Sequence, residues 1–376
     1  MRFSFTEEQE EFRVFLRRFL EDKSPTTEVR RLMETDEGYD DAVWKQLSSE
    51  LGLPAVHVPE EYGGQGFSVA ELAIVVEEMG RALLCAPYFS SAVLATTTIL
   101  EAATEEQKRT LLPPLAGGET RATLAFTEDN GLWEGSGVEA TATASGDGYT
   151  IDGAKSFVLD GHTADSIVVL ARTPGTSGND GLSFFIVSGD ADGLTRTLLK
   201  TTDPTRKQAR LEFKSVQAEL LGQEGAAAGP LAKVLDIAAI CLANEMVGGA
   251  EKLRESALEY SLMRVQFGRQ IGSFQTMKHK SADMLLEVEL AKSAAYYAAA
   301  AAAEGDDETP ALACLAKAGA SQAYMQTAIN TVQIHGGIGF TWDNDTHLWF
   351  KRAKSSEVFL GDPAYHRELL MQRWDV

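Results

Sequence analysis

The last 150 residues contain three long stretches rich in alanine, and these restrict the fold more than any other feature. The stretches lie near residues 226–267, 273–304 and 310–334. Alanine is the strongest helix former, and helices of this length span a whole domain at about 1.5 Å per residue. Long helices of this kind usually pack as a bundle. We therefore predict a four-helix-bundle-like domain over residues 226–376.

The preceding segment has a different texture. Between residues 121 and 225, short runs rich in β-branched or aromatic residues alternate with glycine and aspartate turns, as in ATLAFTE, EATATAS, DSIVVLAR and LSFFIVS. Such runs are typical of strands joined by tight turns. We predict an antiparallel β domain over residues 121–225.

Residues 1–120 are predicted to form a helical domain. Thr6 is a candidate N-cap, followed by glutamates in the first helical turn. Apolar residues then recur at helical spacing from Phe12 to Leu20. Prolines and glycines between residues 52 and 66 separate this helix from later ones. The fold class expected for the whole chain is α+β, mainly α, in the order helices, antiparallel β domain and helical bundle.

Composition excludes several classes of protein. The chain of 376 residues carries a net charge of −21, so it lacks the basic footprint that nucleic-acid binding requires. No apolar run reaches the roughly 18 residues of a membrane span, and the acidic N-terminal segment is unlike a signal peptide, so we expect a cytoplasmic protein. The three cysteines, Cys85, Cys241 and Cys314, lie far apart and indicate neither a metal site nor a disulfide framework.

Two motifs suggest a binding site for a phosphate-bearing ligand. The first is Arg264-Val-Gln-Phe-Gly268, at the predicted end of a helix, where arginine offers a forked donor and glycine lets the backbone come close. A plain glycine turn is the alternative reading. The second is Gln333-Ile-His-Gly-Gly-Ile-Gly-Phe340, in which three of four consecutive positions are glycine. Glycines at this density allow a ligand to approach the backbone closely.

These motifs, together with the helix–β–helix order, resemble the acyl-CoA dehydrogenase family of flavoproteins over essentially the whole chain. In that family the RxQFG segment of one subunit and the QxxGGxG segment of another clasp the diphosphate and adenosine of FAD. The resemblance therefore implies that FAD is the cofactor and that Arg264, Gln266, Phe267, Gln333, Gly336 and Gly337 bind it. His335 lies between these motif residues and is a further candidate for cofactor contact.

The resemblance also implies a reaction and partners. Family members desaturate an acyl-CoA thioester at the α,β bond: a carboxylate removes the α-proton while the β-hydride passes to the flavin. The reduced flavin then passes electrons to an electron-transfer flavoprotein. A dimer or tetramer is expected, because part of each cofactor site comes from a neighbouring subunit.

The sequence departs from the family at the positions of the catalytic base. Most members carry it in a YEGT-like loop, which here reads Phe359-Leu-Gly-Asp362 with Leu360 at the glutamate position. A minority carry it on the helix before RxQFG, at the position of Ala238. Neither leucine nor alanine accepts a proton, so both known base positions are empty.

Three other carboxylates are candidates for roles in this site. Glu245 lies two helical turns beyond Ala238, displaced by about 10 Å along the helix, and is the candidate catalytic base; a salt bridge inside the bundle is the alternative. Asp362 is a second candidate base, with a helix-cap role as the alternative. Asp236 matches an aspartate that many members use near bound CoA and is the candidate substrate residue.

The β domain departs from the family as well. The TEPGAGSD-like segment that touches the flavin ring becomes Thr127–Glu134, which retains Thr127 but places Trp133 at the serine position. The WIT-like segment behind the isoalloxazine becomes Phe157–Leu159, which keeps an aromatic ring and loses the hydroxyl. Thr127 and Phe157 are therefore candidate cofactor-binding residues, with fewer hydrogen bonds to the ring. The basic group Lys351, Arg352 and Lys354 is a candidate phosphate contact, or simply a solvated face.

Three functions are consistent with these features. One is an active, homo-oligomeric acyl-CoA dehydrogenase with an unconventional base. Another is a non-catalytic or half-site subunit of a heteromeric enzyme, which resembles the actinobacterial acyl-CoA dehydrogenases of steroid and side-chain degradation. The third keeps the fold but uses it for a flavin oxidase or monooxygenase.

Overall fold

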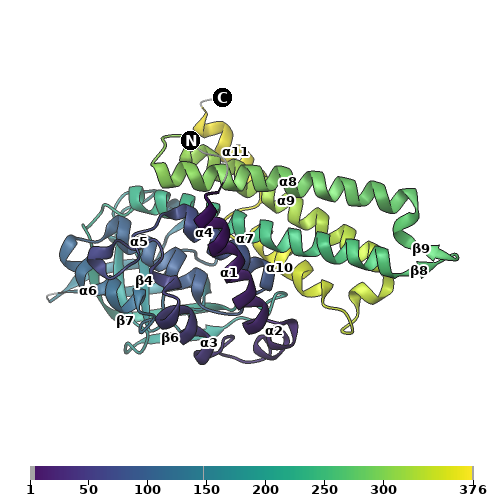
Figure 1. Cartoon of the computed structure of the whole chain (residues 1–376). Helices are drawn as coiled ribbons and strands as arrows, with labels where there is room; N and C mark the ends of the chain where they lie inside the picture. The colour runs from purple at the N-terminus through teal and green to yellow at the C-terminus, as the bar shows by residue number, and fades with distance from the viewer. Residues whose placement is uncertain (1–4, 147, 375–376) are drawn as a thin grey trace. The chain divides into compact units, whose positions relative to one another are not determined.

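The computed structural model describes residues 5–146 and 148–374 and groups them into two compact units (Figure 1). Unit 1 comprises residues up to Arg30, Val69–Leu84 and the chain from Ala239 onward. Unit 2 comprises Arg31–Ser68 and Cys85–Ala238. The division falls within one long helix, between residues 238 and 239. The three domains expected from the sequence stay a prediction about the chain's organisation.

Unit 1 is helical. Its elements are α1 (Glu7–Lys23), α4 (Val69–Ala82), most of α7 (Ala228–Met263), the short strands β8 (Val265–Gln266) and β9 (Arg269–Gln270), α8 (Gln275–Glu304), α9 (Thr309–His335), α10 (Thr346–Val358) and α11 (Pro363–Arg373). α8 contacts both α9 and α4, and α9 contacts α8, α10 and α11, so α9 is the central helix of this unit. The long helical runs expected from the sequence are thus α7, α8 and α9 (Figure 1).

The first helix begins where the sequence predicts. Thr6 caps α1, since its hydroxyl accepts a hydrogen bond from the Gln9 amide at 3.2 Å while the Gln9 side chain accepts one from the Thr6 amide at 2.9 Å. This reciprocal pair satisfies two amides that the helix leaves without partners. Leu16 and Leu20 are buried on the inner face of α1, whereas Phe15, although part of the same apolar run, is half exposed.

Glycines let α4 and α7 approach each other closely. A Cβ on Gly80 would lie 2.1 Å from the carbonyl oxygen of Glu245, and one on Gly248 would lie 1.9 Å from that of Glu77. Side chains at either position would push the two backbones apart. Close contact between these helices therefore depends on two glycines that local helix propensity would disfavour.

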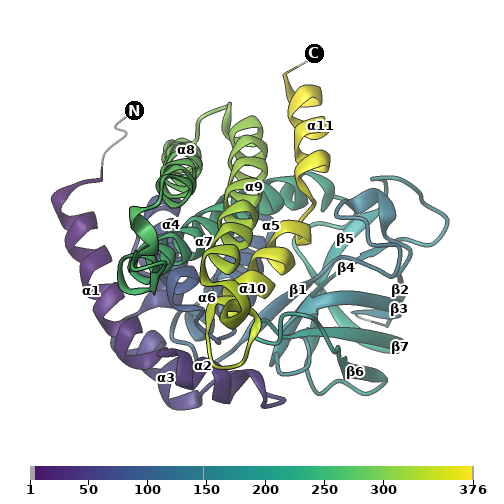
Figure 2. The ribbon, with the colours of Figure 1, turned by 90° about the vertical axis from the view of Figure 1, so that its right-hand side faces the viewer.

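Unit 2 is built around a seven-stranded sheet with short helices. The helices are the end of α2 (Thr26–Met33), whose first part belongs to unit 1, and α3 (Asp41–Lys45), α5 (Thr96–Ala102) and α6 (Glu105–Ala116). The strands are β1 (Ala122–Ala125), β2 (Thr141–Ser145), β3 (Gly148–Leu159), β4 (Ser166–Arg172), β5 (Leu182–Ser188), β6 (Leu194–Leu198) and β7 (Gln208–Leu221). Figure 2 shows β2, β3, β7 and β6 side by side. Of these strands, β6 falls in a run that the sequence pattern did not single out.

The strands pair as β1-β4-β2-β3-β7-β5, and β5 also pairs with β4, so the pairings close the sheet on itself. Closure removes exposed edges that would otherwise invite aggregation. Most pairs are antiparallel as expected, but β1 and β2 both run parallel to β4. The inner face carries the β-branched and aromatic residues of the predicted runs, among them Ile151, Val169 and Phe185.

Candidate functional site

The glycine motif forms a tight turn at the end of α9. The turn spans Gly336–Phe340, and Gly336 has φ +68° and ψ −146°, a conformation that residues with a Cβ avoid. A Cβ built on Gly336 or Gly337 would meet no atom within 4 Å. These two glycines are therefore not required by packing within the chain, and both are exposed. The free space above them suits a ligand or another chain.

The histidine of the same motif is held firmly. His335 is buried, and its Nδ1 lies 2.8 Å from the carbonyl oxygen of Thr331. Because that oxygen only accepts hydrogen bonds, Nδ1 carries the proton. The ring stacks on Tyr260 of α7, with 4.3 Å between centroids. Burial lowers the pKa of His335, so this ring contributes a neutral, fixed surface.

The arginine motif forms a small hairpin after α7. Val265 pairs with Gln270 and Gln266 with Arg269. At its tip Phe267 has φ +54° and is 92% exposed, while Arg264 and Gln266 are also exposed. The hairpin follows α7 directly, and the stacked pair Tyr260–His335 links the end of α7 to the end of α9. We call the hairpin Arg264–Gln270 and the turn Gly336–Phe340 together the clasp.

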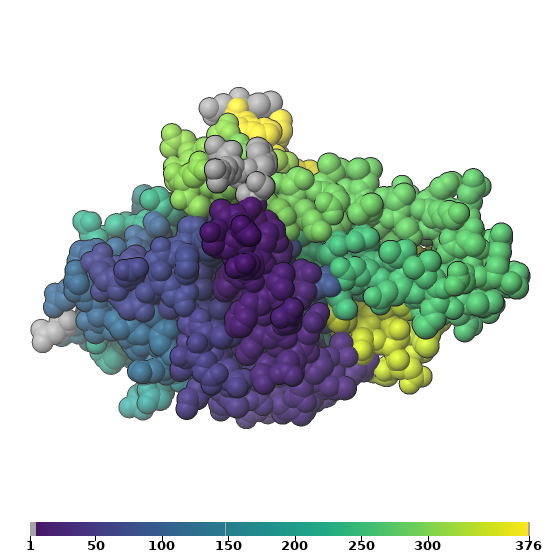
Figure 3. All heavy atoms as spheres, in the orientation of Figure 1, coloured from purple at the N-terminus to yellow at the C-terminus, as the bar shows by residue number. Residues whose placement is uncertain are grey.

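The clasp is surrounded by exposed apolar side chains. Met263 is 72% exposed, Phe340 69% and Trp342 61%, and the exposed surface of residues 260–290 is drawn in green in Figure 3. Large exposed apolar patches mark interaction sites more often than not. A bare backbone at two glycines, a forked cation at Arg264 and an open aromatic ring at Phe267 fit the diphosphate and adenosine of FAD.

The loop in which the resemblance predicts the family's base position has a buried centre. We call residues Glu357–Asp362 the base loop. Phe359 and Leu360 are buried, and Leu360 has φ +61°. Asp362 caps α11, because its Oδ1 accepts the Tyr365 amide hydrogen at 2.8 Å. The carboxylate of Asp362 thus has a cap role, the alternative that the turn-like sequence suggested.

The other candidate base is engaged in an ion pair. Glu245 on α7 and Arg352 on α10 are both buried, and the Arg352 Nη1 lies 3.1 Å from the Glu245 Oε1. A buried carboxylate needs such a partner, since an uncompensated charge there is very costly. The three residues of the predicted basic group, Lys351, Arg352 and Lys354, therefore have different partners. Lys354 pairs at the surface with Glu357, and Lys351 lies 4.9 Å from the ring centre of Trp342.

In unit 2 the candidate flavin-contacting residues lie near a buried ion pair. Thr127 is buried, and its carbonyl oxygen accepts the Ser156 amide hydrogen at 2.9 Å. Next to these residues, the fully buried Lys155 contacts the Glu128 carboxylate at 2.7 Å. Burial lowers the pKa of Lys155 to about 8. Sequence reasoning missed this pair, because Lys155 lies in a strand that also carries the exposed Asp152 and nothing local marks the lysine as buried.

Phe157 lies at an irregularity of β3. The register of β3 against β7 shifts between Lys155 and Val158, and Phe157 takes φ +59° there. Such a bulge turns a side chain away from the alternation of the strand, and Phe157 is 39% exposed. Trp133 is half-buried with its ring 6.1 Å from that of Phe126. Asp236, the candidate substrate residue, is buried on the first part of α7.

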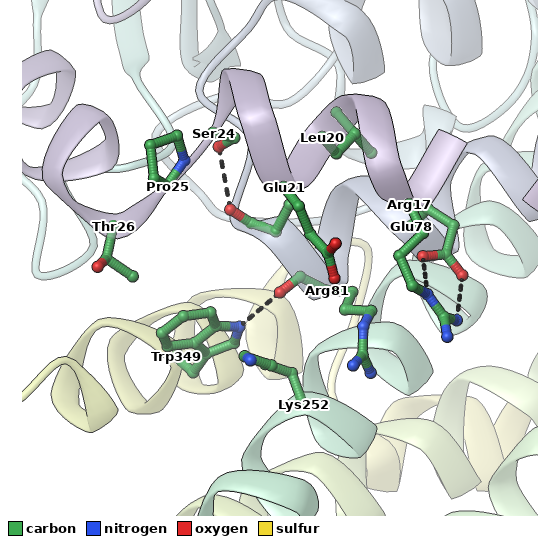
Figure 4. Close-up of a pocket in the computed structure, with 11 residues that line it drawn as sticks. Arg17, Leu20, Glu21, Ser24, Pro25, Thr26, Glu78, Arg81, Lys252 and Trp349 are labelled. Atoms are coloured by element: carbon green, nitrogen blue, oxygen red, sulfur yellow. Dashed lines mark hydrogen bonds and ion pairs between the residues drawn. The ribbon is translucent and has the colours of Figure 1, made fainter. Parts of the chain in front are cut away.

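A separate pocket of about 180 Å³ lies in unit 1 between α1, α4, α7 and α10 (Figure 4). Arg17 binds Glu78 through two hydrogen bonds at its rim, and the Trp349 indole donates to the Arg81 carbonyl oxygen at 3.3 Å. None of the site residues expected from the sequence lines this pocket. Across residues 5–146 and 148–374, no helix combines the length and apolarity needed to cross a bilayer.

Comparison with known proteins agrees with this geometry. Family models match over most of the chain: acyl-CoA dehydrogenase N-terminal domain at residues 6–119, middle domain at 123–216 and C-terminal domain at 231–374. The acyl-CoA dehydrogenase IpdE2 of Mycobacterium tuberculosis is 34% identical over 91% of this chain and 88% of that protein.

Solved structures are similar over the full length. Butyryl-CoA dehydrogenase from Megasphaera elsdenii has a TM-score of 0.93 and 29% identity, covering 100% of both chains. The ChsE4–ChsE5 complex from Mycobacterium tuberculosis has a TM-score of 0.89 and 25% identity, covering 100% of this chain and 99% of that one. A structure described as the electron transferring flavoprotein of Acidaminococcus fermentans contains a chain with a TM-score of 0.93 and 30% identity, covering 100% of this chain and 99% of that chain. The chain belongs to the acyl-CoA dehydrogenase family of flavoprotein oxidoreductases.

Proposed function

We propose that this chain takes part in the α,β-desaturation of an acyl-CoA thioester as one half of a two-chain assembly. In this assembly the chain contributes the clasp for FAD, and a related chain contributes the carboxylate base. The observation that carries the proposal is the contrast between an open clasp and a closed base loop with leucine at position 360. The similar ChsE4–ChsE5 structure, which is a complex, supports it by analogy.

The state of the nearby carboxylates supports this assignment. A base must reach the substrate's α-proton in ionised form and within hydrogen-bond distance. Glu245 is bonded to Arg352, and Asp362 is bonded to the first turn of α11. For either to act as a base, an existing interaction would have to break. A base from another chain avoids that cost.

Bound FAD would supply the hydride acceptor, and this chain's residues would hold it. In the family pattern one subunit supplies the hairpin and a neighbouring subunit supplies the glycine turn. Where this chain supplies the hairpin, Arg264 would donate a forked pair of hydrogen bonds to the diphosphate; where it supplies the turn, the bare backbone at Gly336 and Gly337 would let the diphosphate approach. Phe267 and Gln333, both exposed beside these groups, would cover the adenosine. In unit 2, Thr127 and Phe157 would border the flavin ring, and Asp236 would lie near CoA. Electrons would leave to an electron-transfer flavoprotein.

The proposal is tested by the flavin content of the purified chain. Alone, a half-site subunit should retain little flavin, and a related chain with glutamate at the position of Leu360 should restore about one FAD per pair of chains. The visible absorption spectrum gives the ratio of flavin to protein, and denaturation releases the flavin so that it can be identified. One tightly bound FAD per chain in a homo-oligomer would contradict the two-chain assembly.

A second candidate is a self-sufficient homo-oligomer with Glu245 as base. Its place on α7 favours it, two helical turns beyond Ala238, where a minority of family members carry the base. It predicts that the chain alone bleaches its flavin with butyryl-CoA or with longer or ring-bearing acyl-CoA esters. The two-chain assembly predicts bleaching only when the partner is present.

A further inference from the structure

The base loop contains a strained residue that its own chemistry does not explain. Leu360 has φ +61°, the left-handed region that residues with a Cβ disfavour because of contact with the following carbonyl. Glycine would adopt this conformation without strain. Backbone outliers of this kind persist only where the surrounding structure fixes them, and they gather at functional sites. The contacts that hold Leu360 in this conformation therefore point to residues with a role in the loop.

A fully buried lysine on α9 fixes one side of the loop. Lys317 is 0% exposed. Its Nζ donates to the hydroxyl of Ser321 at 3.1 Å, to the carbonyl oxygen of Glu357 at 3.2 Å and to that of Gly361 at 3.0 Å. An ammonium group has three donors, and these three oxygens match them. Lys317 thus ties the last turn of α10 to the loop beyond it.

The other side of the loop is fixed from α11. The Nε2 of His366 lies 2.9 Å from the carbonyl oxygen of Leu360. Gly361 has φ +101°, and a Cβ there would lie 2.3 Å from Cδ1 of Tyr365. The carbonyl oxygens of residues 357, 360 and 361 all have fixed donors. Leu360 is therefore held between two anchored peptides.

We propose that Lys317 is a positioning residue for the side chain at position 360. Its ammonium group holds the carbonyl oxygens on both sides of Leu360 and so imposes the left-handed backbone that sets the direction of that side chain. This inference rests on the proposed function for its meaning, since position 360 matters as the family's base position. The inference adds that the base loop has a fixed backbone conformation at position 360, although the residue there is leucine and not a carboxylate.

Amide hydrogen exchange of the full chain tests the role of Lys317. The amides of Phe359 and Gly361 donate within the loop, to Ser355 and Val358, and report on its opening. Lys317→Met removes the three donors at similar length and should speed exchange of these amides at least tenfold. Lys354→Met is the matched control, because Lys354 contacts the side chain of Glu357 rather than its carbonyl. The control should change the rates less than twofold.

A second background separates positioning from simple core filling. In Leu360→Gly the left-handed conformation carries no strain, so adding Lys317→Met should change the exchange rates less than threefold. An equal acceleration in both backgrounds, or none in either, would overturn the proposal. If Lys317→Met does not fold, Lys317→Arg replaces it, with the same direction and a smaller factor expected. The measurement needs neither flavin nor acyl-CoA, so its failure is distinct from failure of the two-chain assembly.

Discussion

The clasp and the base loop belong to the same helical unit but have opposite surroundings. Most of the clasp is exposed: a Cβ on Gly336 or Gly337 would meet no atom of the chain within 4 Å, and Phe267 projects almost fully into solvent. The base loop is buried and held by Lys317 and His366. A surface that is complete only with a second molecule has kept its family motif, while an enclosed site has lost its reactive group. In the proposed two-chain assembly, this difference corresponds to cofactor binding by this chain and proton abstraction by its partner.

The largest expected effect comes from restoring the missing group. Leu360→Glu places a carboxylate in a loop whose shape is already fixed, and burial should raise its pKa and its basicity. In the FAD-loaded assembly whose partner chain has had its own base replaced by glutamine, we expect acyl-CoA-dependent flavin bleaching to rise about 10²- to 10⁴-fold over Leu360→Gln, the typical contribution of a general base. Equal rates for the two variants would show that the base loop does not face the substrate.

Glu245 gives the next largest effect, on stability. Glu245→Gln leaves Arg352 buried without its counter-charge, so we expect a loss of about 3–5 kcal/mol in the free energy of unfolding. Chemical denaturation measures this loss. Glu357→Gln, which removes the surface partner of Lys354, is the control and should cost about 1 kcal/mol or less. A stable Glu245→Gln protein that has lost activity would instead identify Glu245 as the base.

The stability of the protein should depend on pH through His366, which contacts the base loop. Burial lowers the pKa of His366 from 6.5 to about 4, so the unfolded chain binds the proton more tightly than the folded chain. Stability is therefore full above pH 6.5 and falls as pH decreases toward 4, by up to about 3 kcal/mol from this group. His366→Gln should flatten the dependence by about one proton. The pKa of His57 is also lowered to about 4, so His57 should still contribute to the pH dependence of stability in this variant. If His366→Gln left the slope of stability against pH unchanged, His366 would not be a source of that dependence.

The smallest expected effect tests the clasp. Gly337 is not in the left-handed region, and a methyl group there would meet no atom of the chain. Gly337→Ala should leave the melting temperature unchanged and weaken FAD binding about tenfold, or about 1.4 kcal/mol. Fluorescence titration of flavin measures the affinity. Gly319→Ala, at another open glycine in α9, is the control, and equal affinities for both variants would remove the clasp from the cofactor site.

Local patterns predicted many elements but not every pairing. The Thr6 cap, the long helices α7, α8 and α9 and most strands follow from short-range rules of propensity and periodicity. The parallel pair β1–β4 was not foreseen, because strand direction depends on connections far apart in sequence. β6 was not singled out, since LTRTL is short and only partly buried.

The candidate site shows the same limit. Lys317 lies in an alanine-rich helical run, where sequence alone gives a lysine no reason to be buried. Arg352 belongs to a basic group whose sequence is typical of a solvent-exposed face. In the structure it instead pairs with Glu245, which is 107 residues away in the sequence. Such pairs arise from packing between helices, and no local pattern encodes them.

By itself, the sequence determined the helix–β–helix order, the two motifs of the clasp and the absence of a carboxylate at both familiar base positions. These are properties of residue type and spacing, which the chain carries before it folds. Only the tertiary structure decided that Glu245 is paired, that Asp362 caps a helix and that Lys317 anchors the base loop. The physical reason is that burial and partners set what a charged side chain does, and both are fixed only when distant segments meet.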